Sequence, residues 1–372
     1  MTAKVMVVGG GIAGMSSAIA LHDRGFAVEL IEVDPAWRVY GAGITITGPT
    51  LRAFASLGIL DQVRARGYTG DGLVVRNVAG EILSSIPTPV RSNDEIPGTG
   101  GIMRPVLHGI LSAAVRDRGI AVRLGCTVDS FEHGAHDVAV RLSDGSSARY
   151  DLVVGADGVQ SQVRSLLFPD APRPEFTGQA CWRLVARRSP EIDRRCYFLG
   201  GPVKVGLTPV SATEMYMFLL ERTETKERHD ESDLPGRLRT LLAGYGGPLA
   251  EIRDSIDDAS RIVYRPLEVF EMPAPWSRGR VQLIGDAVHP TTPQLASGAG
   301  LAAEDGLVLA DELAASSSVE EALARFMKRR WARCRLVVET SLEIGRLEQR
   351  RAPVEEQTAL VAQTLEALAA AI

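Results

Sequence analysis

KVMVVGGGIAG, at residues 4–14, is the stretch of the chain that decides the fold. It opens with a short apolar run, which is typical of a buried parallel strand. Gly9, Gly11 and Gly14 then follow with the spacing G-x-G-x-x-G. In this motif the first glycine permits a tight turn, the second lets the backbone approach a pyrophosphate, and the third lets a helix pack on the strand. The spacing predicts a nucleotide-binding turn between a strand and a helix.

The residues after the glycines complete a βαβ unit. We expect a helix over residues 12–23 and a second strand over residues 26–31, which Glu32 closes. The helix N-terminus offers free N–H groups to phosphates, and an acidic residue at this distance can accept hydrogen bonds from a ribose. Because strand, glycines, helix, strand and acid occur in order, the stretch predicts a dinucleotide-binding domain rather than an isolated glycine-rich turn.

Composition limits the remaining classes of protein. A length of 372 residues suggests two domains, and a net charge of −5 offers no basic surface to nucleic acid. The cysteines and histidines show neither a disulfide framework nor metal-ligand spacing, so we expect no metal. No apolar run outside the nucleotide stretch is long enough to span a membrane. We therefore expect a cytoplasmic protein without a membrane partner, as a monomer or homodimer.

The middle of the chain has a different pattern. Residues 176–270 alternate between apolar and polar positions and are punctuated by Pro, Gly and Ser, which favours an antiparallel sheet. Residues 73–86 are typical of a hairpin, residues 35–50 of a loop and residues 50–66 of one helix. The fold class is therefore α/β, a Rossmann-like domain interleaved with an antiparallel β-sheet domain and followed by C-terminal helices. The predicted boundaries are 1–70, 98–172 and 271–372 for the first domain, and 71–97 and 173–270 for the second.

Two further stretches have the form of ligand-binding turns. One strand runs into Asp157-Gly158, and another delivers Gly285-Asp286. After the second, a proline-rich loop leads to small residues that open a helix and allow a ligand close to the backbone. His289 lies in this second stretch, where it is either a catalytic base or a structural residue.

Together these three stretches resemble the single-component (group A) FAD-dependent aromatic monooxygenases, which have the p-hydroxybenzoate hydroxylase-like fold. The likeness runs from Lys4 to about Leu313. The loop at residues 290–293 is most similar to the branch of urate hydroxylases, salicylate hydroxylases and tetracycline-modifying enzymes. The resemblance implies that NADH or NADPH reduces FAD, which takes up O2 as a C4a-hydroperoxide and hydroxylates a small aromatic or heteroaromatic, phenol-like substrate. The lack of a second G-x-G-x-x-G fits transient binding of the nicotinamide donor.

The resemblance also implies which residues contact FAD. The glycine motif holds the pyrophosphate and Glu32 the adenosine ribose. Arg104 reaches the pyrophosphate or the ribityl region, and Asp157 supports FAD and the nicotinamide donor. Asp286 binds the ribityl chain, Pro293 lies against the flavin ring, and the backbone of residues 298–300 meets the pyrimidine edge. The full expected set is Gly9, Gly11, Ile12, Ala13, Gly14, Glu32, Arg38, Arg104, Asp157, Asp286, Pro293, Gly298, Ala299 and Gly300.

Substrate groups are expected from the antiparallel sheet, which this fold sets over the flavin ring. Arg183 and Lys204 are candidates to hold an anionic or phenolate oxygen, and Tyr216 to hydrogen-bond or stack. Lys204 equally fits the solvent face of a strand. Thr47, with Thr45, is a weaker candidate for the pocket border. In place of Ser297 relatives usually carry Gln, a departure that bears on flavin mobility and pocket shape.

Several other functions are compatible with part of the pattern. A flavin-dependent halogenase of this fold carries a W-x-W-x-I-P stretch, which the sequence lacks. A reductase of the same fold, or a flavin-binding protein without turnover, would use the same cofactor motifs. An NAD-dependent dehydrogenase explains the first motif but leaves Asp157 and Asp286 without a role.

Overall fold

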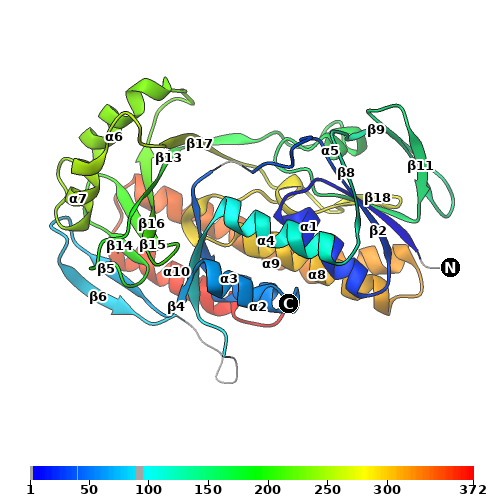
Figure 1. Cartoon of the computed structure of the whole chain (residues 1–372), viewed down its shortest axis with the longest axis horizontal. Coiled ribbons are helices and arrows are strands. Elements are labelled where there is room, and N and C mark those ends of the chain that lie inside the picture. Colours follow the sequence, from blue (N-terminus) through cyan, green and yellow to red (C-terminus); the bar gives the residue numbers. More distant parts are fainter. Residues whose placement is uncertain (1–2, 40, 89–94) are drawn as a thin grey trace.

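The computed structural model describes residues 3–39, 41–88 and 95–372, and two large β-sheets lie at opposite ends of the molecule in Figure 1. The first sheet has the order β18-β19-β12-β1-β2-β8 and is parallel except for β18. Its strands are β1 (Lys4–Val8), β2 (Ala27–Glu32), β8 (Ala121–Leu124), β12 (Leu152–Gly155), β18 (Ser277–Arg278) and β19 (Val281–Leu283). This is the predicted Rossmann-like sheet.

Helices cover the parallel sheet at close distance. The α1 helix packs directly on the backbone of α8 at Gly306. A Cβ added to Gly306 would lie 2.6 Å from the backbone nitrogen of Ser17 in α1, so this close approach requires glycine. At Gly14 an added Cβ would lie 1.8 Å from the Gly9 carbonyl oxygen, so only glycine lets α1 follow the turn. The helices of this part are α1 (Ile12–Asp23), α4 (Arg104–Asp117), α5 (Gln162–Leu167), α8 (Gly298–Ala315), α9 (Val319–Gln349) and α10 (Val354–Leu368).

The second sheet has seven strands in the order β17-β13-β16-β15-β14-β5-β6. All its pairs are antiparallel except β14 with β5, and the hairpin predicted at residues 73–86 forms its edge. Its strands are β5 (Leu73–Arg76), β6 (Ile82–Ile86), β13 (Glu175–Arg187), β14 (Cys196–Phe198), β15 (Lys204–Pro209), β16 (Glu214–Arg222) and β17 (Val263–Val269). Segments far apart in the sequence thus share one sheet, as the interleaved fold class requires.

The alternation along β13 sends its side chains to two different cores. Ala180, Trp182 and Leu184 pack with α6 (Leu234–Leu241) and α7 (Pro248–Ser255), which follow the 3-10 turn η1 (Glu231–Asp233). Cys181 belongs to a separate core with Tyr216, on the opposite face. Because the side-chain period of a strand is two, Arg183 lies on the face of Cys181, away from α6 and α7.

Two elements differ from the sequence-based expectation. The loop predicted at residues 35–50 contains β3 (Gly43–Thr47), which forms a small sheet with β7 (Thr99–Met103) and β4 (Tyr68–Gly70). The helix predicted at residues 50–66 is divided into α2 (Gly48–Ser56) and α3 (Leu60–Arg66), because Gly58 adopts φ +72° between them. A further three-stranded sheet consists of β9 (Val128–His133), β10 (Val138–Leu142) and β11 (Ser147–Tyr150).

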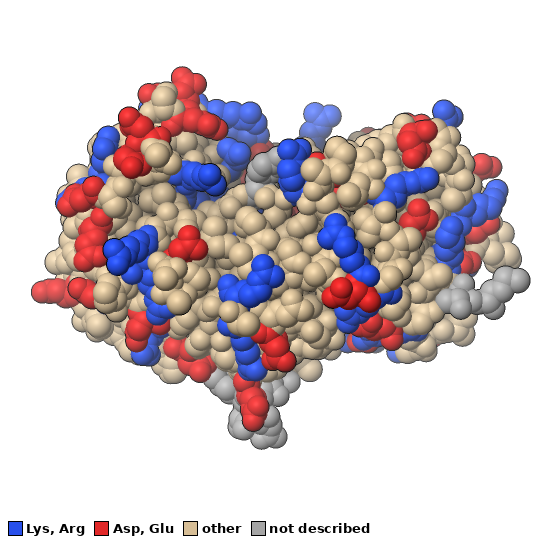
Figure 2. All heavy atoms as spheres, in the orientation of Figure 1, with Lys and Arg blue, Asp and Glu red and all other residues tan. Residues whose placement is uncertain are grey.

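The surface carries no large patch of one charge on the face shown in Figure 2, where basic and acidic side chains are interspersed. All four cysteines are buried free thiols. Among the described residues, no helix combines the length and the apolar character needed to cross a bilayer. The predicted domain boundaries stay a prediction, and residues 89–94 of the segment 71–97 lie outside the described residues.

Candidate active site

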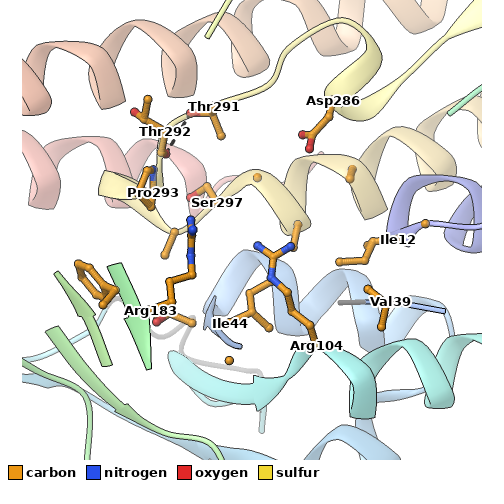
Figure 3. A pocket seen from close by; sticks show the side chains of 18 of the residues that line it. Ile12, Val39, Ile44, Arg104, Arg183, Asp286, Thr291, Thr292, Pro293 and Ser297 are labelled. Atoms are coloured by element: carbon orange, nitrogen blue, oxygen red, sulfur yellow. Dashed lines mark hydrogen bonds between the residues drawn. The ribbon is translucent and has the colours of Figure 1, made fainter. Parts of the chain in front are cut away.

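A cavity of about 350 Å³ lies between the two sheets. Its walls come from the glycine turn, the start of α4, the inner face of the antiparallel sheet and the loop that leads into α8 (Figure 3). The predicted residues that line it are Gly11, Ile12, Ala13, Thr45, Arg104, Arg183, Tyr216, Asp286, Pro293, Ser297, Gly298 and Ala299. Gly158 of the second motif also lines it, so the cavity brings together residues from all three sequence motifs.

The glycines of the turn have separable roles. Gly9 has φ +107°, and a Cβ there would lie 2.5 Å from the Ala156 carbonyl oxygen, so this glycine serves the fold. Gly11 has φ −80°, and a Cβ there would meet no atom of the described residues within 4 Å. No described residue requires glycine at position 11, which instead opens onto the cavity at the N-terminus of α1.

Trp37, which the sequence analysis did not single out, packs against this turn at Gly10. Its indole Nε1 donates a hydrogen bond to the Gly10 carbonyl (2.9 Å), while the Gly10 N–H donates to Glu32 Oε2 (2.6 Å). Trp37 holds a left-handed φ of +47° and lies under the Arg116 guanidinium, 4.8 Å from the ring centroid. A loop tryptophan carries no sequence signal for this contact.

Asp286, in the 3-10 turn η2 (Gly285–Ala287), projects into the cavity (Figure 3). It lies deep in the protein, although its side chain is exposed to the cavity itself. Burial raises the pKa of Asp286, and the charges of His289 and Arg104 act in the opposite direction. No described residue donates a hydrogen bond to its carboxylate, which is therefore available to a ligand.

Arg183 reaches into the cavity from β13, and Figure 3 shows its guanidinium directed toward Pro293 and Ser297. None of the described carboxylates pairs with it. Burial raises the pKa of Tyr216 to about 12 even though Arg183 lies beside it. Tyr216 is thus a neutral hydrogen-bonding group at neutral pH, and Arg183 is a cation without a counter-ion among the described residues.

Eight predicted residues do not line the cavity, and four of them have other partners in the protein. Lys204 Nζ donates to Glu348 Oε1 (2.6 Å), and Thr47 Oγ1 is 3.0 Å from Thr50 Oγ1. Arg38 is exposed and pairs with Asp34. Asp157 accepts from the Val163 N–H at the start of α5 (3.0 Å). The other four are neighbours of lining residues but do not line the cavity themselves: Gly9, Gly14, Glu32 and Gly300. The cavity is also lined by residues that were not predicted, among them His108, Tyr197, Thr291 and Thr292.

His289 is buried away from the cavity wall, in an ionic network. Its Nε2 is 2.7 Å from Asp305 Oδ2, and Asp305 Oδ1 accepts from Arg330 Nε (2.7 Å). Burial opposes a charged His289, but Cys334 and Asp305 outweigh it and raise its pKa well above the usual value. A protonated imidazole held this way is structural rather than a base.

The ligand atoms of His289, Asp305 and Cys334 lie within 4.8 Å of one another, as metal ligands do. However, the Arg330 guanidinium already donates to Asp305 and to the Cys334 sulfur (3.5 Å). A cation therefore already neutralises this cluster, and it is not a site for a metal ion.

Acidification is expected to weaken the fold through Asp305. Burial would raise its pKa, but His289 and Arg330 lower it from 3.8 to about 2. A carboxyl whose folded pKa is depressed stabilises the protein above the unfolded pKa and loses that contribution as the pH falls through the folded pKa, here about 2 kcal/mol. Urea unfolding of wild type and Asp305→Asn should show their stability difference shrinking below about pH 4. A difference that stays constant down to about pH 2 would contradict this assignment.

Comparison with known proteins matches this geometry to a family. The family described as "FAD binding domain" matches residues 2–341. The 2-heptyl-3-hydroxy-4(1H)-quinolone synthase of Pseudomonas aeruginosa is 34% identical over 352 residues, covering 94% of this chain and 90% of that protein. The putative FAD-dependent monooxygenase YetM of Bacillus subtilis is 30% identical over 356 residues, covering 95% and 96%. Klebsiella pneumoniae HpxO, solved with FAD and uric acid, has a TM-score of 0.83 at 25% identity, covering 98% of this chain and 93% of HpxO.

Proposed function

The chain belongs to the FAD-binding-domain family, and from this premise we propose that it hydroxylates a small nitrogen heteroaromatic ring that carries an acidic oxygen. It is an FAD-dependent monooxygenase, in common with relatives named for that activity. The co-substrates of the proposed reaction are O2 and NADH or NADPH. The observation that carries the proposal is the Arg183 guanidinium, which reaches into the cavity with no described carboxylate paired to it, beside the aromatic side chains Tyr197 and Phe218.

The residues of the cavity fit FAD. The open space at Gly11 admits a pyrophosphate next to the N–H groups that begin α1. The Asp286 carboxylate is free to accept hydrogen bonds from ribityl hydroxyls, and Arg104 supplies positive charge to the same cavity. When bound, FAD supplies the redox chemistry, accepting hydride from the nicotinamide donor and activating O2. The N-terminus of α8, at Gly298, would place partial positive charge near the flavin ring.

The substrate side of the cavity is built for a planar ring with one anionic edge. Tyr197 and Phe218 stand edge to face, with ring centroids 5.9 Å apart, and with Leu267 they give an apolar wall. No described carboxylate neutralises Arg183, and an oxyanion of the substrate would do so with a charge-assisted hydrogen bond. The phenol of Tyr216 would orient the same oxygen. The wall also excludes water from the reacting atoms.

Two named relatives act on rings of this kind. One is the quinolone synthase, and another is the FAD-dependent urate hydroxylase of Klebsiella pneumoniae, which is 29% identical over 344 residues. Both names describe a nitrogen heterocycle that bears oxygen. This likeness supports the proposed class of substrate, and the experiment below identifies which compound of that class is hydroxylated.

The test uses the FAD-loaded protein and the visible absorption of its flavin. NADH and NADPH are added under nitrogen with and without 4-hydroxyquinoline, uric acid or salicylate, and air is then admitted. We expect bleaching that one of the heterocycles accelerates, followed by recovery in air and a hydroxylated product. A protein that takes up no FAD, or whose flavin neither donor reduces, would refute the proposal.

Replacing Arg183 with methionine tests whether this side chain binds the acidic oxygen of the substrate. The variant should retain FAD, while the KM for the heterocycle rises about tenfold because a charge-assisted hydrogen bond is lost. Arg187→Met, at the exposed end of the same strand, is the matched control and should leave KM unchanged. Equal KM values for both variants and the wild type would remove Arg183 from the substrate site.

A further inference from the structure

A buried polar network joins the loop before α8 to the antiparallel sheet. Gln294, in the 3-10 turn η3 (Pro293–Leu295), donates from Nε2 to Gln179 Oε1 of β13 (3.0 Å) and to Glu348 Oε2 of α9 (3.2 Å). Glu348 Oε1 accepts from Lys204 Nζ of β15 (2.6 Å). Four elements that are distant in sequence therefore meet at one carboxylate.

The network is almost completely shielded from solvent. Gln179 and Gln294 are each 3% exposed, and the side chains of Lys204 and Glu348 are 11% and 6% exposed. Gly345 of α9 leaves room for the two amides, because a Cβ there would lie 2.8 Å from Gln179 Oε1. A buried ion pair contributes little net stability compared with apolar packing, but it can select a single arrangement of the groups it joins.

Both ends of the network touch the cavity wall. Gln294 follows Pro293 directly, and Pro293 lines the cavity on the side that we propose faces the flavin. Lys204 Nζ lies 5.1 Å from the centroid of the Tyr197 ring, which lines the opposite, substrate side. A shift of the Glu348 carboxylate would thus be transmitted to both walls at once.

We propose that Lys204, Glu348 and Gln294 are positioning residues that fix the distance between the Pro293 loop and the aromatic substrate wall. This inference rests on the proposed function, since it concerns the same cavity. The expected consequence is that oxidation of the nicotinamide donor stays coupled to hydroxylation of the substrate. With the network intact, the substrate ring stays within reach of the reacting flavin atom. Without it, the donor is still oxidised, but O2 is released as hydrogen peroxide instead of entering the substrate.

The test compares FAD-loaded wild type with Lys204→Met and Lys204→Arg. For Lys204→Met we expect FAD affinity close to wild type, a shifted visible band of the bound FAD, and about tenfold less product per NAD(P)H oxidised, with a matching rise in peroxide. Lys204→Arg keeps the charge and should restore coupling in large part. The ligand for these assays is whichever of the three panel compounds accelerates bleaching most.

Lys226→Met is the matched control. Lys226 Nζ pairs with Glu268 Oε1 at the same 2.6 Å but is half exposed and does not line the cavity. If Lys204→Met does not fold, the double variant Lys204→Met with Glu348→Gln removes both charges and carries the same expectation. Full coupling and an unshifted flavin band in the charge-free variant, beside an active wild type, would overturn the inference. An inactive wild type would instead reject the proposed function.

Discussion

Gly11→Ala is expected to lower the affinity for FAD about a hundredfold, equivalent to about 2.7 kcal/mol, while the apoprotein folds normally. Within the part of the chain that the structure describes, the added methyl group would meet no atom within 4 Å, and φ −80° suits alanine as well as glycine. The methyl group would therefore occupy only the space that a pyrophosphate needs at the start of α1. Quenching of flavin fluorescence on titration measures the affinity, and thermal unfolding of the apoprotein checks the fold.

Gly14→Ala is the contrasting substitution on the same turn. Its Cβ would lie 1.8 Å from the Gly9 carbonyl oxygen, a backbone atom that cannot move aside. We expect little folded protein from this variant, because the contact lies inside the packed βαβ unit. If Gly11→Ala bound FAD as wild type does, the pyrophosphate would have to lie elsewhere, and Gly11 would lose its proposed role.

The parts of the fold that the sequence predicted are those specified by local patterns. The turn at residues 9–14 was predicted from the spacing of its glycines, and the limit at Gly14 is local, because an added Cβ there would meet the Gly9 carbonyl. The alternation in β13 likewise determined which face carries Arg183. Asp286 follows the buried strand β19 after only Ile284 and Gly285, so its place near the strand end could be predicted from its position in the sequence.

The parts that it missed depend on contacts distant in sequence. The sequence left open whether Lys204 faces the pocket or the solvent, because the pattern of a strand does not show what packs against the strand's first residue. The structure places Glu348 there, 144 residues away, and so directs the amine away from the cavity. Trp37 beneath Gly10 is a second case. The strand at residues 43–47 is a third contact of this kind. Gly43 leaves room for Tyr216, because a Cβ added to Gly43 would lie 2.4 Å from the Cβ of Tyr216.

Arg330→Met is expected to lower the free energy of unfolding by about 3–5 kcal/mol. Arg330 is 0% exposed and donates to Asp305 Oδ1 (2.7 Å), to Glu304 Oε2 (2.9 Å) and to the Leu301 carbonyl (3.3 Å). Methionine fills similar space but leaves buried carboxylates without this cation. Urea unfolding at neutral pH measures the loss.

Arg335→Met, on the same helix, provides the control because its pair with Glu339 is about half exposed, and such pairs contribute at most about 0.5 kcal/mol. The effect of Arg330→Met should also reach the cavity. Asp305 accepts a hydrogen bond from the Gly285 N–H (2.8 Å), next to Asp286, so a displaced Asp305 would move the carboxylate that we propose holds the ribityl chain. A variant that lost less than about 1 kcal/mol would show that Arg333, which also bonds Glu304, suffices to neutralise the network.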